Sequence, residues 1–433
     1  MTESGVTGFT RVFEKLTCEG LDHLLSIVVL LHALLGSALG LWKADIDSAY
    51  RRMPVFPRHR NFVAFALRTA CGILVAQHFS APFGAPASVY YWDRVGECIA
   101  HIARTLLYLP VCRYVDDFFA PDFSVESATE AKQVFARLCR ALLGFDSISE
   151  AKLRAGNPLV TLGLNVTLTS ETFLCHLSPD KAAKWLEAIK HALRTGILHA
   201  RQAKTMAGRL SFAAGHCFRR LGRAMIRPIL QQAYAPLKHG RVGRELRLAL
   251  LFWLHVLTHN LTQAHVLEAE PQRFELFTDA RGMPPHLGAV LVPAGGASAQ
   301  WLWTDCSVPS EVLATFSHRA DDQIVGLELL GVLLGLASFA QQLRSQNVRI
   351  WCDNVAGECI LRRGSAKKSD HNWLAHWVWR FAYDSGIGLD IQRVASDDNV
   401  ADEPSRECYS LLDQIGAERV RPVLPETARK PRD

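Results

Sequence analysis

The sequence lacks several patterns that would assign it to a class at once. Its 11 cysteines include no C-x-x-C pair, and no His/Cys cluster has the spacing of zinc ligands. It also contains no repeat of solenoid length and no low-complexity tract. These absences argue against a zinc module and a repeat protein. They predict reduced cysteines in an intracellular protein, cytoplasmic or nuclear.

The composition is that of a folded protein with more than one domain. Hydrophobic residues make up 49% of the chain and charged residues 21%. A length of 433 residues is enough for two or three domains with cores of their own.

Positive charge is concentrated in one segment. From Lys181 to Leu250 there are 15 Lys or Arg residues, against only Glu187 and Glu245, although the whole chain has a net charge of only +6. The rest of the chain is therefore net acidic. This pattern is typical of a nucleic-acid-binding surface beside metal-binding carboxylates. Solvated arginine faces on a helical pair are the alternative, and charge alone leaves both open.

One apolar stretch requires a separate interpretation. Residues 24–42 carry no formal charge, which makes them a transmembrane candidate by length. They lack the basic region and the small-residue cleavage site of a signal peptide. A membrane span would also place Asp45 against lipid headgroups. We therefore expect a buried helix here. A membrane-anchored protein, in which residues 24–42 span the bilayer, stays open as the less favoured alternative.

Two acidic groups lie in apolar surroundings. Asp116 and Asp117 are adjacent in "VCRYVDDFFAP", and adjacent carboxylates need either water or a cation. In "LWKADIDSAY", strand alternation would put Asp45 and Asp47 on one face. A strand carrying one carboxylate and a hairpin carrying two can converge on two divalent cations, as two-metal phosphoryl transfer requires.

Four stretches, in order, resemble the palm motifs of retroelement reverse transcriptases. They are "KADIDSAY", "APFGAPASVYYWDRV", "YVDDFF" and "SEAKLRAGNPLVTLGLNV". The resemblance implies that Asp45, Asp116 and Asp117 bind catalytic magnesium ions. The family motif, in which the Asp lies five residues before an aromatic residue, selects Asp45 and Tyr50 and leaves Asp47 outside the ligand set.

The same resemblance implies four substrate-binding positions. The Tyr50 ring would lie against the sugar of the incoming nucleotide and exclude a 2′-hydroxyl group. Phe83 and Gly84 would form a turn under the template, and Lys152 would lie near the departing pyrophosphate. Taken singly, Tyr50 could be a core residue, Gly84 a turn glycine and Lys152 a solvated lysine.

The basic helices after these motifs are similar to the thumb of such enzymes. A thumb grips duplex backbone without reading sequence, through phosphate contacts from Arg and Lys. The residues expected to make such contacts are Arg209, Arg219, Arg220 and Arg223.

The last third of the chain contains a second series of carboxylates. Asp279 lies in a first strand, Glu328 in a helix, Asp353 at the end of a later strand and Asp402 in a final helix. The series resembles ribonuclease H, in which four carboxylates hold two magnesium ions that cleave RNA in RNA–DNA hybrids. Singly, Glu328 could be a helix-dipole residue and Asp353 a strand-end cap.

The expected fold class is an α+β right-hand polymerase palm with a helical thumb, followed by an α/β ribonuclease H-like domain. The expected domains are truncated fingers with an N-terminal helix (1–43), palm with partial fingers (44–177), basic helical thumb or connection (178–268), ribonuclease H-like domain (269–410) and a C-terminal tail (411–433).

The expected function is RNA-directed DNA synthesis by a mobile retroelement, with linked hybrid cleavage. It would use two Mg²⁺ ions per site, or Mn²⁺, with RNA template, DNA primer, RNA–DNA hybrid and deoxynucleoside triphosphates as partners. The alternative is a catalytically decayed or host-retained nucleic-acid-binding protein. Three departures from the family pattern favour this alternative. Few residues precede Asp45, and the helix after Gly84 looks short. The loop "RVASDDNVAD" also lacks the histidine that many ribonucleases H carry there. The presence of all seven candidate carboxylates favours the enzyme.

Overall fold

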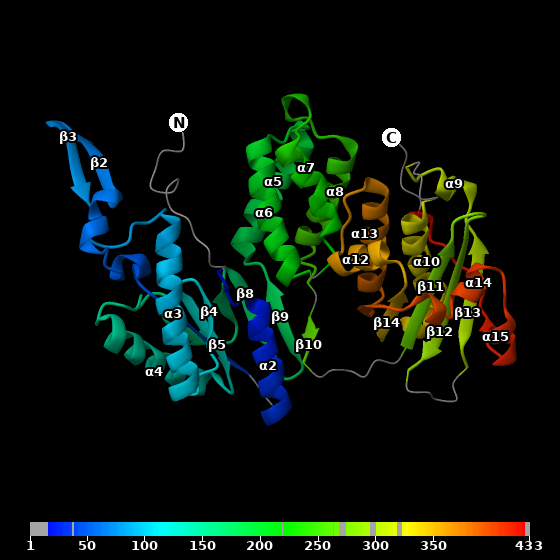
Figure 1. The fold of residues 1–433 in the computed structure, drawn as a ribbon, viewed down its shortest axis with the longest axis horizontal. Helices are drawn as coiled ribbons and strands as arrows, with labels where there is room; N and C mark the ends of the chain where they lie inside the picture. The colour runs from blue at the N-terminus through cyan, green and yellow to red at the C-terminus, as the bar shows by residue number, and fades with distance from the viewer. Residues whose placement is uncertain are drawn as a thin grey trace. The chain divides into compact units, whose positions relative to one another are not determined.

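The computed structural model describes residues 16–36, 39–218, 220–262, 264–267, 274–294, 300–317 and 323–428. The chain divides into two compact units. The N-terminal unit comprises Met1–Ser178 with Ala264–Glu268, and the C-terminal unit comprises Pro179–Gln263 with Ala269–Asp433 (Figure 1).

The main sheet of the N-terminal unit brings distant carboxylates together. It has the order β4-β5-β1-β6. The strands are β1 (Gly40–Asp45), β4 (Cys112–Tyr114), β5 (Asp117–Asp122) and β6 (Arg154–Gly156). β1 pairs antiparallel with β5, so Asp45 lies opposite Asp117. Trp42, Phe118 and Phe135 are fully buried in the core beside this sheet.

Helices α3 (Pro86–Leu106) and α4 (Val125–Leu143) contribute to the same core. Their buried residues recur at helical spacing, which is the pattern of an amphipathic helix on a core. α3 begins shortly after Gly84 and has 21 residues.

The remaining strands of the N-terminal unit form two further sheets. One is the hairpin of β2 (Ala64–Thr69) and β3 (Gly72–Gln77). The other has the order β10-β9-β8-β7. Its strands are β7 (Leu159–Thr161), β8 (Leu164–Leu168), β9 (Thr172–His176) and β10 (His265–Val266).

The apolar stretch over residues 24–42 is neither one helix nor fully buried. Helix α2 (Leu21–Leu35) ends at Gly36, which has the left-handed φ of 72°, and β1 begins at Gly40. Leu30 is 55% exposed and Leu34 is 69% exposed. The expectation of a buried helix is therefore wrong for its second half. Among the described residues, no helix is long and apolar enough to cross a membrane.

The basic segment forms helices of the C-terminal unit. They are α5 (Pro179–Thr195), α6 (Ala200–His216), α7 (Arg227–Tyr234) and α8 (Arg244–Thr258). In α8 the buried side chains recur three or four residues apart, from Leu246 to Leu257. This periodicity is why a segment rich in arginine still folds against a core.

The rest of the C-terminal unit is built on a six-stranded mixed sheet with the order β15-β14-β11-β12-β13-β16. The strands are β11 (Phe274–Arg281), β12 (His286–Pro293), β13 (Leu302–Ser307), β14 (Asn347–Cys352), β15 (Gly388–Arg393) and β16 (Glu418–Arg419). β11, β12 and β13 are antiparallel neighbours, whereas β14 runs parallel to β11.

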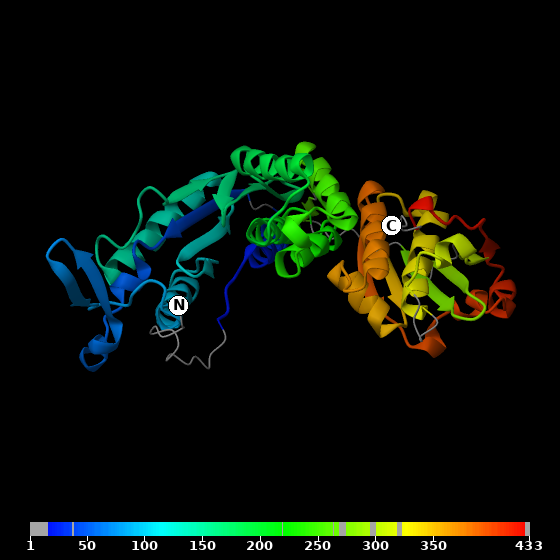
Figure 2. The same cartoon turned by 90° about the horizontal axis from the view of Figure 1, so that it is seen from above.

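Helices cover both faces of this sheet (Figures 1 and 2). α10 (Ile324–Ser338), α12 (Val355–Arg363) and α13 (Ser369–Asp384) contribute to the large core on one face. α14 (Asp402–Ser405) and α15 (Ser410–Gln414) lie on the other, where Leu412 packs with Val290 and Trp303.

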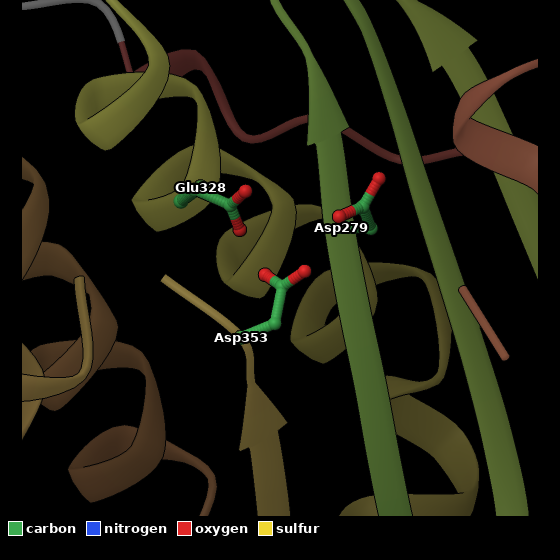
Figure 3. Close-up of side chains that lie close together, drawn as sticks. All are labelled: Asp279, Glu328 and Asp353. Atoms are coloured by element: carbon green, nitrogen blue, oxygen red, sulfur yellow. The ribbon is translucent and has the colours of Figure 1, made fainter. Parts of the chain in front are cut away.

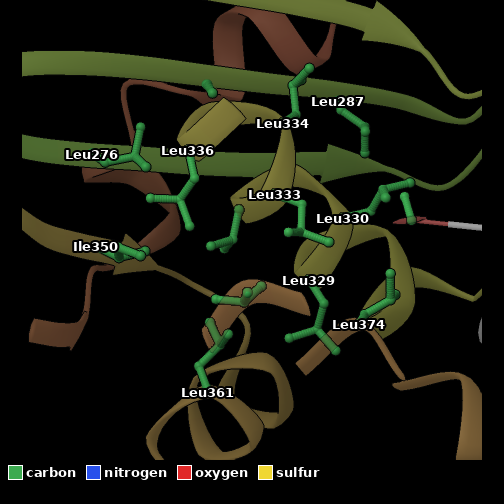
Figure 4. Packing of buried hydrophobic residues seen from close by; sticks show 14 of the residues in the cluster. Leu276, Leu287, Leu329, Leu330, Leu333, Leu334, Leu336, Ile350, Leu361 and Leu374 are labelled. Carbon is green, nitrogen blue, oxygen red and sulfur yellow. The ribbon is translucent and has the colours of Figure 1, made fainter. Parts of the chain in front are cut away.

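α10 is apolar on all sides because it is buried on all sides. Its leucines pack against strand and helix side chains such as Leu276, Leu287 and Leu374 (Figure 4). Gly335 allows the close approach, because a Cβ atom there would lie 2.9 Å from Leu276.

The coarse part of the expected fold class, mixed α and β structure with a multi-strand sheet, is confirmed. The identification of a palm, a thumb and a ribonuclease H-like domain stays a prediction, as do the expected domain boundaries. Residues 1–15 and 429–433, which belong to the expected first and last segments, lie outside the described residues.

Two candidate carboxylate centres

The first centre lies in the C-terminal unit, where the sheet and α10 meet. Ligand oxygens of Asp279, Glu328 and Asp353 all lie within 4.8 Å of one another (Figure 3). Asp279 comes from β11, Glu328 from the second turn of α10, and Asp353 directly follows β14. Because β11 and β14 are parallel neighbours, both carboxylates leave the same edge of the sheet.

Burial makes this centre costly in the absence of a cation. Glu328 is 3% exposed and Asp279 is 6% exposed. Burial, together with the charges of Asp279 and Asp353, raises the pKa of Glu328 to about 9. Burial also raises the pKa of Asp279. Neither carboxylate forms an ion pair with a described Lys or Arg side chain, so only a proton or a cation can neutralise them.

The residues fit a divalent cation. Glu328 Oε2 is buried and has no hydrogen-bond partner among the described residues. Three carboxylates at this spacing offer the oxygen ligands that Mg²⁺ and Mn²⁺ prefer. We therefore identify this set as a candidate metal centre.

The fourth predicted carboxylate stands beside the centre. Asp402 begins α14 and pairs with Arg406 at 2.7 Å, and it does not belong to the three-carboxylate set. Its charge nevertheless contributes to raising the pKa of Asp279. Sequence reasoning missed Ser405, whose hydroxyl donates to Asp279 Oδ2. Its position three residues after Asp402 in "NVADEPSR" was the available signal.

The second centre lies in the N-terminal unit at the β4–β5 turn. Asp45 is buried, and Asp117 faces it across β1 and β5. Burial, then the charges of Asp45 and Asp116, raise the pKa of Asp117 to about 6. Burial and the charge of Asp45 also raise the pKa of Asp116. The charges of these carboxylates act on one another. Among the described residues, however, they do not form a set of three ligand oxygens within 4.8 Å, as Asp279, Glu328 and Asp353 do.

A cationic side chain already contacts this centre. Lys152 Nζ lies 2.8 Å from Asp45 Oδ2. That hydrogen bond raises the pKa of Lys152. Asp47, in contrast, lies beyond the end of β1 and is exposed. The expectation that Asp45 and Asp47 share one face of a strand is therefore wrong.

The turn that carries Asp116 is held by two residues that sequence reasoning missed. Val115 has the left-handed φ of 57°, which is unfavourable for a β-branched residue. Its carbonyl accepts Trp92 Nε1 at 2.9 Å and Arg113 Nη1 at 3.1 Å. Arg113 is 1% exposed and pairs with Asp93. A charged residue inside an apolar strand was the only signal.

The predicted substrate-binding residues lie near the N-terminal centre. Tyr50 belongs to a short 3-10 helix, Ala49–Arg52, and its ring lies 5.2 Å from the Phe83 ring in an edge-on arrangement. Burial, followed by the charge of Asp116, raises the pKa of Tyr50. Gly84 has a φ of 87°, which only a glycine adopts without strain.

The predicted nucleic-acid-binding arginines fall into different environments. Arg209 lines a cavity between α5 and α6. Arg220 is held in the fold: its Nε donates to the carbonyl of Arg362, and its guanidinium lies 5.0 Å from the Trp379 ring. Arg223 is exposed, and its Nη1 lies 3.4 Å from the carbonyl of Arg363. Arg219 lies outside the described residues.

No protein-family model matches the sequence, and neither does any curated protein. Solved structures that resemble the chain include foamy viral protease–reverse transcriptases. One, in complex with double-stranded DNA, has a TM-score of 0.43 and 13% identity over 90% of this chain and 62% of that chain. Another, with an RNA/DNA hybrid, has a TM-score of 0.42 and 12% identity over 89% of this chain and 47% of that chain. A third, with double-stranded DNA, has a TM-score of 0.43 and 14% identity over 90% of this chain and 74% of that chain.

The chain thus spans less than two thirds of the length of the first two of these proteins.

Proposed function

We propose that the chain is an RNA-directed DNA polymerase with a linked ribonuclease H activity, and that it derives from a retroelement. The observation that carries the proposal is that Asp45 of β1 lies opposite Asp117 of β5, with Asp116 in the turn just before β5. A second carboxylate centre and a basic helical segment on the same chain support it.

In the N-terminal centre, Asp45, Asp116 and Asp117 would hold two Mg²⁺ ions, with Mn²⁺ as a substitute. Such ions activate the attacking 3′-oxygen of the primer and neutralise charge on the leaving pyrophosphate. Lys152 Nζ stays protonated beside Asp45 and can give its charge to the pyrophosphate. The Tyr50 ring would limit the sugar pocket, so deoxynucleoside triphosphates are the expected substrates, on an RNA template with a DNA primer.

In the C-terminal centre, Asp279, Glu328 and Asp353 would hold the cations, with Asp402 at the edge of the site. The Ser405 hydroxyl fixes one oxygen of Asp279, so the carboxylate keeps one orientation. The substrate would be the RNA strand of an RNA–DNA hybrid. Arg209, Arg219, Arg220 and Arg223 are the residues proposed to contact nucleic-acid backbone.

The test is primer extension on an RNA template with Mg²⁺ and deoxynucleotides. Asp116→Ala should abolish extension, because it removes a ligand from the N-terminal centre. Asp47→Asn is the matched control, since Asp47 is an exposed acid two residues from Asp45. Extension at the wild-type rate in Asp116→Ala would refute the polymerase assignment.

A second candidate function is nucleic-acid binding or hybrid cleavage without DNA synthesis. It is favoured by the Lys152–Asp45 ion pair, which already satisfies one carboxylate of the N-terminal centre. Hybrid cleavage without extension in the wild-type chain would select this candidate.

A further inference from the structure

The C-terminal unit contains a cavity apart from both carboxylate centres. Its volume is about 340 Å³, and it lies between α7, α8 and the start of α13. Pockets of a few hundred Å³ are the usual size for small ligands. Neither proposed activity uses this cavity.

Aromatic and apolar side chains form its walls. Tyr234 and Trp373 provide rings, and Leu248 and Pro228 provide aliphatic surface. Trp373 Nε1 donates to the carbonyl of Thr427 at 2.9 Å, which fixes the indole in its plane. The cavity therefore has two aromatic side chains in its lining, and Lys204 Nζ lies 5.8 Å from the Tyr234 ring centroid. Aromatic rings are the usual partners of a flat ligand ring.

A neighbouring amide makes the wall rigid. Asn372 Nδ2 donates to the carbonyl of Ala224 at 2.9 Å, and its Oδ1 accepts the amide of Ala366 at 3.0 Å. These bonds tie the start of α13 to the segment before α7. A ligand would thus meet a site that needs little ordering, which favours binding.

Two cations line the same cavity. Arg227 is half-buried and Lys367 is exposed, and neither side chain forms an ion pair or hydrogen bond with another described residue. One carboxylate, Glu245, also lines it and accepts the Ser369 hydroxyl. The cations attract an anion, whereas Glu245 disfavours a ligand that is anionic throughout. The cavity is matched by a ligand with an anionic group and an uncharged flat part.

We propose that this cavity binds a nucleotide, with the base against Trp373 and Tyr234 and the phosphate at Arg227 and Lys367. Base stacking on aromatic rings combined with a cationic phosphate contact is a common way to hold nucleotides. The nucleotide is either free or one unit of a single strand. The proposal is independent of catalysis at the carboxylate centres.

The experiment measures binding of AMP to the full chain by equilibrium dialysis in EDTA, so that no divalent cation supports binding at the carboxylate centres. Adenosine and inorganic phosphate serve as half-ligands, and a 5′-phosphorylated tetradeoxyadenylate represents the single strand. AMP or the tetranucleotide should bind more tightly than either half-ligand.

The variants test the location. Lys367→Glu should weaken binding about tenfold or more, the loss expected when a charge-assisted hydrogen bond is replaced by repulsion. Lys368→Glu is the matched control, because Lys368 is the next residue, is exposed and does not line the cavity. Leu248→Trp should block binding by filling the cavity, and unchanged thermal unfolding would show that the variant is folded.

The pattern of binding decides between the two ligands. If Lys367→Glu loses AMP binding and Lys368→Glu keeps it, the cavity is a site for free nucleotides. The same pattern with the tetranucleotide alone supports a strand-binding site. Absence of binding by both, phosphate binding as tight as AMP, or equal losses in Lys367→Glu and Lys368→Glu would each overturn the proposal.

Discussion

Asp279 in β11 and Asp353 directly after β14 stand at equivalent positions along two parallel strands of the C-terminal unit. Phe277 of β11 pairs in register with Trp351 of β14, and each carboxylate follows two residues later. The two aromatic rings also stack, with centroids 5.9 Å apart. Sheet register therefore sets the spacing of the two carboxylates, and Glu328 completes the set from α10.

The pH dependence of stability should report on Glu328. Its pKa is raised from 4.5 to about 9, so between these pH values the folded protein holds a proton that the unfolded chain has lost. Stability should therefore fall as pH rises through this window when no divalent cation is present. When thermal unfolding is measured with a chelator from pH 5 to 9, the melting temperature of Glu328→Gln should fall less steeply with pH than that of the wild type.

Divalent cations extend this test. Mn²⁺ should raise the melting temperature of the wild-type chain at pH 8, and less so that of Glu328→Gln, because binding to the folded state stabilises it. Glu418→Gln, on an exposed residue of β16, is the control. In the pH series with a chelator, an equal fall of melting temperature with pH in the wild type and in Glu328→Gln would contradict a raised pKa of Glu328.

Sugar selection should depend on Tyr50. If its ring limits the pocket, Tyr50→Ala should raise ribonucleotide incorporation relative to deoxynucleotide incorporation, as measured by single-nucleotide extension. Tyr108→Ala changes an 85% exposed tyrosine and should leave the ratio unaltered. An unchanged ratio in both variants would assign Tyr50 a purely structural role against Phe83.

The basic helices should bind duplexes in a salt-dependent way. Arg209→Glu should weaken primer–template binding regardless of sequence and reduce the salt slope by about 0.9 for a lost phosphate contact. Fluorescence anisotropy at several salt concentrations measures this slope. An unaltered slope would indicate that Arg209 does not contact phosphate.

Arg220 requires a different expectation, because its guanidinium packs on Trp379 and donates to the Arg362 carbonyl. Arg220→Glu should lower the melting temperature as well as affinity. A melting temperature equal to that of the wild type would contradict the structural part of this role.

The β4–β5 turn should depend on Trp92. Trp92→Phe removes the donor to the Val115 carbonyl, so a buried acceptor loses one of its partners. The free energy of unfolding, measured in urea, should fall by about 1–3 kcal/mol. Tyr91→Phe, at the neighbouring and more exposed position, should cost less. Equal losses would show that the hydrogen bond does not hold the turn.

Local sequence patterns predicted the elements that carry the carboxylates. The apolar strands around Asp45 and the adjacent Asp116 and Asp117 indicated a strand and a hairpin, and the structure has both. The basic segment and the segment that carries Glu328 were likewise expected to be helical, and the structure has α5 and α10 there. These features depend on neighbours within a few residues along the chain.

Long-range contacts were not predictable in the same way. The contacts of Arg113 and Trp92 with Val115, and of Ser405 with Asp279, join residues from separate elements. The second half of α2 was misjudged because an uninterrupted apolar sequence indicates burial, whereas Leu30 and Leu34 are exposed. Which face of such a helix is covered depends on tertiary packing.

Cleavage of the RNA strand in an RNA–DNA hybrid, with Mg²⁺ or Mn²⁺, tests most directly whether the register-matched carboxylates act together. Asp353→Asn keeps the size of the side chain and removes its charge, and Asp413→Asn changes an exposed acid of α15 as the control. The wild type and Asp413→Asn should cleave, and Asp353→Asn should be slower by several orders of magnitude. Equal cleavage by the wild type and Asp353→Asn would contradict the site.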